Sequence, residues 1–191
     1  MINIELLEGR TDKVFYCEPA SLNVSRINEK DELIKREFSM ISPRYIKWNY
    51  KGEEIVINSE NVMEGFCIDK NYIYTIDIIT GDPKSNNIII YNFEGKIHTK
   101  ATAPFLKTPE LNPIEGNKRL ADIGGFRRLD RKDKNSSYFL DINGIRHILV
   151  LLYYQVSGDF YDRRGEPHEL QALNVETGEF HPTWCKYYGR M

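Results

Sequence analysis

The chain has 191 residues, of which 41% are apolar and 28% are charged, and its formal net charge at pH 7 is −2. This length and balance predict a single folded domain over residues 1–191, with two small domains as the alternative, and argue against wholesale disorder. The small net charge excludes the broad basic field on which non-specific nucleic-acid binding relies. Aromatic residues make up 12% of the chain, with twelve Tyr, and such residues favour half-buried strands. The composition therefore predicts a β-rich domain.

The sequence carries no signal for secretion, membrane insertion or disulfide formation. The stretch MINIELLEGRTDK lacks a basic region followed by an apolar one. The longest apolar runs, such as HILVLLYY at 147–154, are far shorter than the roughly 20 residues that span a bilayer. Cys17, Cys67 and Cys185 lie far apart without a C-x-x-C pair, which is typical of reduced thiols. We therefore expect a cytoplasmic protein with no cofactor, no metal ion and no membrane partner.

The first predicted element is an amphipathic helix at about residues 28–40. Asn28 or Ser25 can cap its N-terminus, acidic residues follow in the first turn, and Pro43 ends it. Its apolar face has helical spacing and consists of Leu33, Ile34, Phe38 and Ile41. The pattern favours a structural helix that packs on a sheet over a partner-binding helix.

After this helix the sequence becomes a series of short alternating strands separated by turns. Four segments share one pattern: a strand, then Asn or Asp, an apolar residue, one or two polar residues, Gly, and a second strand. The Asn or Asp and Gly positions are Asn49 and Gly52, Asn92 and Gly95, Asp141 and Gly144, and Asn174 and Gly178. Asn and Asp initiate turns, and Gly accepts the positive φ that a tight hairpin needs.

The spacing of these hairpins suggests a repeat. Successive glycines of the pattern lie 43, 49 and 34 residues apart, close to the period of about 40–45 residues of a four-stranded propeller blade. Four copies are too few for an ordinary closed propeller. We therefore predict a mostly β fold of propeller-like antiparallel hairpins, in the form of a partial propeller, a twisted meander or a sandwich. The alternative is that four similar turns arose by convergence on turn chemistry.

One long segment, residues 99–137, breaks the strand pattern and is predicted to be an irregular loop, with NKRLADI as a candidate short helix. Its second half, 118–134, has seven Lys or Arg against three Asp, a local net charge of +4. A second charged and aromatic cluster is GDFYDRRGEPHE at 158–169.

These two clusters are the predicted binding sites for a protein partner, because Arg and aromatic side chains are the usual anchors of protein interfaces. The residues are Phe126, Arg127, Arg128, Arg131, Lys132, Phe160, Tyr161, Arg163 and Arg164. RNA binding through residues 126–134, with Phe126 and Tyr138 stacking on bases, is an alternative. The three aspartates of the 118–134 segment argue against a dedicated RNA groove.

No catalytic signature is present, and we predict no catalytic residue. The chain has neither a G-x-S-x-G elbow nor a phosphate-binding loop. Three histidines follow pattern glycines by three residues, which permits a three-His metal site or merely marks a polar strand face: His98, His147 and His181. Carboxylate pairs leave a small β-scaffold hydrolase as an alternative function: Asp159 with Asp162, and Asp77 with Asp82.

The hairpin NNIIIYNFEGKIH at 86–98 and the ending LNVETGEFHPTWCKYYGR are similar to immunity proteins of bacterial polymorphic-toxin and contact-dependent growth inhibition systems. This resemblance covers residues 86–98 and 170–190, under a fifth of the chain. It implies a non-enzymatic cytoplasmic protein that binds and neutralises a cognate toxin. Such proteins have no shared catalytic residues to transfer, and their toxin-binding positions vary.

Overall fold

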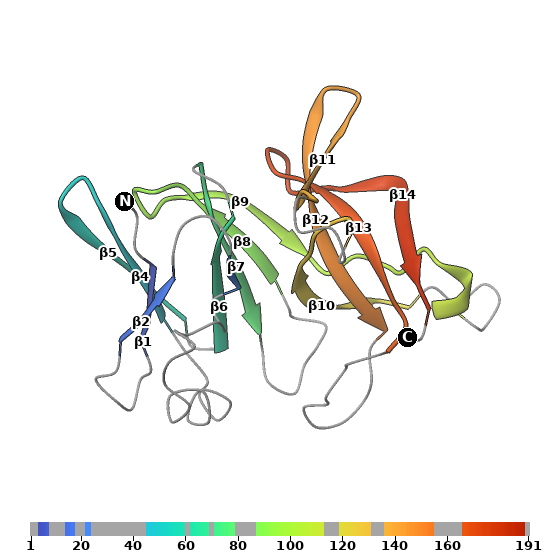
Figure 1. The fold of residues 1–191 in the computed structure, drawn as a ribbon, viewed down its shortest axis with the longest axis horizontal. Helices are drawn as coiled ribbons and strands as arrows, with labels where there is room; N and C mark the ends of the chain where they lie inside the picture. Colours follow the sequence, from blue (N-terminus) through green and yellow to red (C-terminus); the bar gives the residue numbers. More distant parts are fainter. Residues whose placement is uncertain are drawn as a thin grey trace. The chain divides into compact units, whose positions relative to one another are not determined.

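The computed structural model describes residues 4–7, 14–17, 22–23, 45–59, 62–68, 71–78, 87–112, 119–130, 136–154 and 166–189. Within these residues the chain is mostly antiparallel β structure with almost no helix (Figure 1), which confirms the predicted fold class. The helix predicted at about 28–40 lies outside the described residues.

The strands form three antiparallel sheets. The first sheet has the order β2-β1-β4-β5 and consists of β1 (Ile4–Leu7), β2 (Val14–Cys17), β4 (Tyr45–Tyr50) and β5 (Glu53–Asn58). The second has the order β3-β6-β7-β8-β9 and consists of β3 (Leu22–Asn23), β6 (Val62–Cys67), β7 (Ile73–Ile78), β8 (Asn87–Tyr91) and β9 (Ile97–Thr102). The third has the order β10-β12-β13-β14, with β11 also paired to β12, and consists of β10 (Ala121–Phe126), β11 (Phe139–Ile142), β12 (Ile145–Tyr154), β13 (His168–Asn174) and β14 (Phe180–Tyr188).

The chain divides into two compact units. The first unit comprises Met1–Thr80 and Ile88–His98, and the second comprises Gly81–Asn87 and Thr99–Met191. That the whole of residues 1–191 folds as a single domain stays a prediction.

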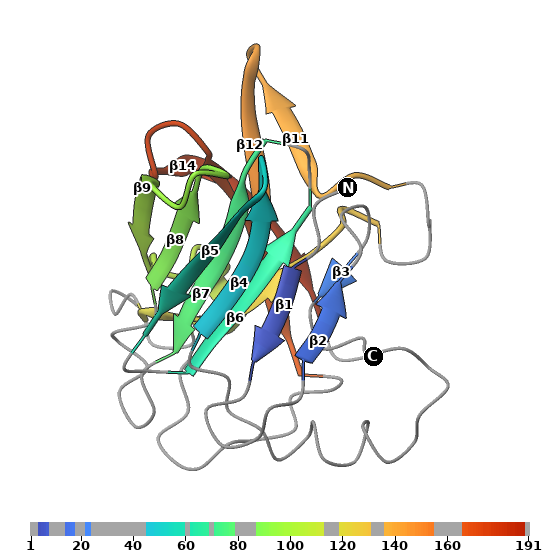
Figure 2. The ribbon, with the colours of Figure 1, turned by 90° about the vertical axis from the view of Figure 1, so that its left-hand side faces the viewer.

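In the first unit, the first sheet packs on the second (Figure 2). Ile46 of β4 is fully buried, and its Cγ2 lies 2.9 Å from the place that a Cβ on Gly65 of β6 would take. Trp48 is also buried, and its indole N–H donates a hydrogen bond to the carbonyl of Phe93 at 2.8 Å. This bond ties β4 to the turn after β8, so Trp48 serves both as core and as anchor.

All four predicted hairpins are present, and Gly52, Gly95, Gly144 and Gly178 all have a positive φ. Two of the turns have two residues, Lys51-Gly52 and Asn143-Gly144, and both residues of each have positive φ, as a type I′ turn requires. The turns that follow Asn92 and Asn174 are longer.

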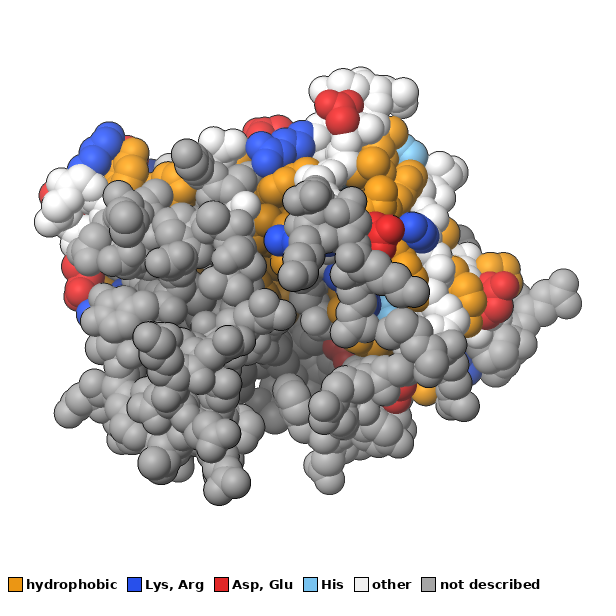
Figure 3. All heavy atoms as spheres, in the orientation of Figure 1, with side chains coloured by type: hydrophobic (Ala, Val, Ile, Leu, Met, Phe, Trp, Pro, Cys, Tyr) orange, Lys and Arg blue, Asp and Glu red, His pale blue; other side chains and the backbone are white. Residues whose placement is uncertain are grey.

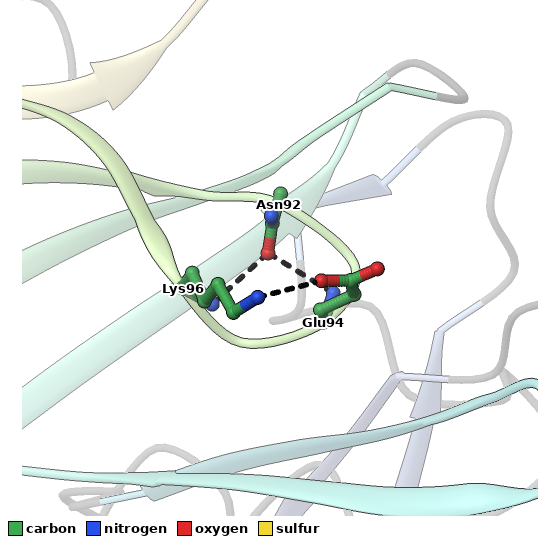
Figure 4. Close-up of polar contacts among 3 residues, drawn as sticks. All are labelled: Asn92, Glu94 and Lys96. Atoms are coloured by element: carbon green, nitrogen blue, oxygen red, sulfur yellow. Dashed lines mark hydrogen bonds and ion pairs between the residues drawn. The ribbon is translucent and has the colours of Figure 1, made fainter.

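The longer turns are closed by their Asn side chains. Asn92 Oδ1 accepts hydrogen bonds from the backbone N–H groups of Glu94 (3.0 Å) and Lys96 (2.9 Å), as Figure 4 shows. The Lys96 ammonium also bonds the Glu94 carboxylate at 3.1 Å, and this hydrogen bond lowers the pKa of Glu94. Asn174 Oδ1 accepts the N–H of Glu176 at 2.9 Å in the same way. The four hairpins therefore have two turn types, and in each the Gly adopts the positive φ that its turn requires. Their repetition as a structural unit stays a prediction.

The irregular stretch is shorter than predicted. The segment 99–137 includes the end of β9, a 3₁₀ helix η2 (Pro109–Leu111) and β10. The described part of the candidate helix NKRLADI, residues 119–123, instead leads into β10, where burial alternates with a period of two. The sequence did not predict this strand because a pair of glycines, Gly124 and Gly125, is typical of a loop. In the structure the pair lies at a β-bulge in the pairing of β10 with β12.

In the second unit, a buried carboxylate fixes residues 105–112 on one face of the third sheet. Glu169 is 0% exposed, and its carboxylate accepts the backbone N–H groups of Lys107 (3.0 Å) and Thr108 (2.9 Å). Gln171 donates to the same carboxylate at 2.6 Å and to the carbonyl of Phe105 at 2.8 Å. The charge is thus compensated by three N–H donors, as a buried carboxylate requires.

The Lys107 side chain continues this attachment towards β14. Its ammonium donates to the backbone carbonyls of His181 and, at 3.4 Å, of Trp184. Burial lowers the pKa of Lys107, because removal from water penalises the charged form.

Candidate protein-interaction surface

The face of the third sheet opposite Glu169 has a small apolar centre, and we call it the Leu149 face. Leu149, Leu170 and Ala172 are fully buried there and lie on neighbouring strands. Partly buried hydrophobic residues pack around this centre: Leu129, Leu140, Ile142, Leu151, Trp184 and Tyr188. Figure 3 shows hydrophobic side chains on the second unit together with Lys, Arg and His side chains and with some Asp and Glu side chains.

Arg127 connects β10 to the start of β13 across this face. Its backbone N–H donates to the carbonyl of Leu149 at 3.0 Å, and its Nη1 lies 2.6 Å from His168 Nε2. A guanidinium only donates, so His168 Nε2 accepts. His168 Nδ1 lies 2.8 Å from the carbonyl of Glu166 and therefore carries the hydrogen. These partners assign the neutral Nδ1–H form to His168, which is buried.

Leu129 attaches the basic segment 127–130 to the Leu149 face and to β14. Its side chain packs against the apolar centre, and its carbonyl accepts the hydroxyl of Tyr188 at 2.6 Å. Lys186 Nζ lies 3.5 Å from the same carbonyl. The segment 127–130 is therefore attached to the sheet through Arg127 and Leu129.

Cations lie over aromatic rings along this surface. The Arg127 guanidinium lies 5.9 Å from the centre of the Tyr188 ring, and the Lys186 ammonium lies 5.3 Å from it. The Arg128 guanidinium lies 5.2 Å from the centre of the Tyr138 ring. Each such contact is worth about 0.5–1 kcal/mol at an exposed site. The rings therefore restrict where these positive charges can lie.

The structure describes three of the nine residues predicted to bind a partner. Arg127 lies at the Leu149 face, and Arg128 lies over the ring of Tyr138, whose carbonyl accepts the N–H of Leu149. Phe126 is paired with Val150 in the sheet. Residues paired in this way share a face, and here it is the face that carries Glu169, opposite the Leu149 face. The other six lie outside the described residues: Arg131, Lys132, Phe160, Tyr161, Arg163 and Arg164. The bond between Arg127 and His168 brings one end of each predicted cluster together.

Sequence reasoning missed the contribution of β14. Trp184, Lys186 and Tyr188 alternate along this strand and contact the Leu149 face or its cations. The signal was present, because residues at i, i+2 and i+4 of a strand share a face. It was overlooked because β14 lies about 60 residues after the segment 127–130 that it contacts.

The histidines and carboxylates do not form a metal centre within the described residues. The rings of His147 and His181 lie 5.7 Å apart, whereas His98, in the other unit, stacks on Tyr72 with 4.4 Å between ring centres. The described part of the chain has no group of three His, Cys, Asp or Glu side chains that could hold a metal ion. Of the carboxylate pairs, Asp77 accepts the hydroxyl of Ser59 at 2.7 Å. The other carboxylates, Asp82, Asp159 and Asp162, lie outside the described residues.

Among the described residues, no helix has the length and apolar character needed to cross a membrane.

Comparisons with known proteins show a similarity of fold and no similarity of sequence. No family model matches the chain, and no curated protein sequence matches it. The fold is similar to a chain in the solved structure of Tne2 in complex with Tni2, with a TM-score of 0.53 and 8% sequence identity over 100% of both chains. At this identity the likeness shows a shared fold.

We expect the Tyr188→Phe substitution to lower the free energy of unfolding by about 1 kcal/mol, because it removes a partly buried hydrogen bond and keeps the ring. Urea denaturation measures this value, with Tyr187→Phe on the same strand as the control. Equal stabilities of the two variants would show that the bond between Tyr188 and Leu129 does not hold the basic segment.

Proposed function

We propose that this chain is a non-enzymatic, protein-binding module, an immunity protein that neutralises a cognate bacterial toxin by direct binding in the cytoplasm. The observation that carries the proposal is the surface at the Leu149 face where Arg127, Arg128 and Lys186 lie over Tyr rings. Arg and Tyr are enriched among the residues that dominate binding energy at protein interfaces.

The hydrogen bonds that order these side chains favour a binding role for this surface. The Arg127 guanidinium is bonded to His168, and the Tyr188 hydroxyl is bonded to Leu129. Side chains ordered before association lose less conformational entropy when a partner binds. A surface of ordered cations and aromatic rings therefore suits tight capture of a protein, which neutralisation of a toxin requires.

Two further findings support a protein partner. The structural neighbour was solved as a complex of Tne2 with Tni2, and the similarity covers the whole of both chains. The second is the resemblance of residues 86–98 and 170–190 to immunity proteins, which rests on the sequence pattern alone and implies a toxin as the partner. The second of these segments contains β14, whose Lys186 and Tyr188 belong to the proposed binding surface.

Co-expression with the protein encoded by the adjacent gene tests the proposal. We expect that protein to stop bacterial growth when expressed alone, and this chain to restore growth and co-purify with it. If the adjacent gene product is toxic, and this chain neither restores growth nor is retained with it, the proposal is wrong.

The binding surface predicts a charge-sensitive variant. We expect the double substitution of Arg128 and Lys186 by Ala to raise the Kd for the adjacent gene product by about 10- to 100-fold, because it removes two cations placed beside aromatic rings. Calorimetric titration measures the Kd. The matched control is Lys100→Ala, an exposed Lys on β9. An effect of the control as large as that of the double variant would contradict the assignment of this surface.

A further inference from the structure

The β11–β12 hairpin extends beyond the rest of the third sheet. β12 pairs with β13 only from His147 to Leu152, whereas β11 pairs with Ile145 to Ile148. The residues around the turn are therefore paired only with each other, and Figure 1 shows the hairpin projecting past the other strands of its sheet. A projecting element of this kind can enter a concave surface that a flat sheet face cannot reach.

The tip of this hairpin is conformationally restricted. Asn143 and Gly144 form a two-residue turn with φ of 55° and 78°. The Asp141 carboxylate accepts the N–H of Gly144 at 2.8 Å. A type I′ turn matches the twist of the strands that it joins, and so it holds their ends in register. The tip is thus ordered before any partner binds.

One residue beside this polar turn is apolar and exposed. Ile145, directly after the turn, is 48% exposed, and its cross-strand partner is Ile142. Ile142 and Leu140 lie on the same side of β11, and both pack against the centre of the Leu149 face. The exposed Ile145 therefore ends a row of apolar side chains that begins at the proposed binding surface. An exposed apolar row continuous with such a surface indicates a contact site.

Positive charge accompanies this exposed apolar residue. Arg146 follows Ile145 in the chain, on the other face of the hairpin, and its guanidinium lies 3.8 Å from the centre of the Phe139 ring. The described residues 126–130, 136–149 and 184–188 contain four Lys or Arg (Arg127, Arg128, Arg146 and Lys186) and two Asp (Asp130 and Asp141), a net charge of +2. A partner complementary to this region has an excess of carboxylates around the site that receives Ile145.

We propose that the tip of the β11–β12 hairpin inserts Ile145 into an apolar cleft of the protein partner, with carboxylates at the rim of the cleft facing Arg146 and Arg128. This inference rests on the proposed function, since the partner is the same toxin. It adds that the β11–β12 hairpin is the element that enters the partner, and that the receiving cleft is apolar with carboxylates at its rim.

The test compares Ile145→Asp with Val56→Asp in titrations against the protein encoded by the adjacent gene. Val56 is an exposed β-branched residue of β5, at 40% exposure, and so it is a matched control in another sheet. We expect Ile145→Asp to raise the Kd at least 30-fold and Val56→Asp to change it less than threefold. Ile145→Val keeps the apolar character of the side chain, so we expect it to retain most of the wild-type affinity.

Amide hydrogen exchange on the wild-type complex gives a second readout that needs no variant. We expect slower exchange at residues 142–146 in the complex than in the free chain. If the wild-type chain binds and these amides are not protected, the hairpin inference is wrong, whatever the variants show. If the amides are protected but Ile145→Asp binds as tightly as the wild type, insertion of Ile145 is also wrong, while the proposed function stands. If the wild-type chain does not bind, both the proposed function and the hairpin inference are wrong.

Discussion

Replacing Glu169 by Leu is expected to lower the free energy of unfolding by about 3–5 kcal/mol. Glu169 is fully buried, and its carboxylate accepts the N–H groups of Lys107, Thr108 and Gln171. Leu has a similar volume but no acceptor, so it leaves buried donors without partners, and the larger part of the loss comes from these donors.

Chemical denaturation of the Glu169→Leu variant measures this effect, with the exposed Glu179→Leu as the control. Glu169→Gln separates shape from hydrogen bonding, because it keeps one acceptor oxygen and turns an NH₂ group towards the donors. We expect its stability to lie between those of the wild type and Glu169→Leu. A loss below about 1 kcal/mol for Glu169→Leu would show that residues 105–112 do not depend on this carboxylate.

Substituting Gly178 by Ala is expected to cost about 3 kcal/mol or more, whereas Gly144→Ala costs only about 1 kcal/mol. Both glycines follow the same sequence pattern and have similar φ, 73° and 78°. A Cβ on Gly178 would meet the backbone carbonyl of Lys100 and the hydroxyl of Thr99, while a Cβ on Gly144 meets nothing within 4 Å. The difference between the two variants therefore isolates the close approach of the β13–β14 turn to β9.

Thermal or urea unfolding of the two alanine variants gives this difference directly. Because the carbonyl of Lys100 belongs to the backbone, it cannot move aside as a flexible side chain would. Equal losses for Gly178→Ala and Gly144→Ala would mean that φ alone decides the cost and that the turn does not pack tightly on β9.

The turns could be predicted from the sequence, because their determinants are local. Asn92 closes its turn with residues two and four positions further along the chain, and Gly52, Gly95, Gly144 and Gly178 supply the positive φ. The strand β10 was missed for a local reason as well, since Gly124 and Gly125 form a bulge that the sequence does not distinguish from a loop.

The candidate surface could be predicted only in part, because its bonds join distant positions. Arg127 and Arg128 were identified by their residue type, but the partner of Arg127 is His168, 41 residues further along the chain. Trp48 is tied to Phe93 over 45 residues in the same manner. Such pairs depend on strand order and register, which a single sequence does not contain. The charge and aromatic content of a binding segment are therefore predictable, whereas the bonds that hold it are not.

The central claim is that the Leu149 face of the third sheet binds a protein partner. Nuclear magnetic resonance of the isotope-labelled 22.4 kDa chain, titrated with the unlabelled protein encoded by the adjacent gene, tests it most directly. We predict that the largest chemical-shift changes fall on residues 127–130 and 184–188. Changes confined to β4 and β5 of the first sheet, or no changes at saturating partner, would contradict the claim.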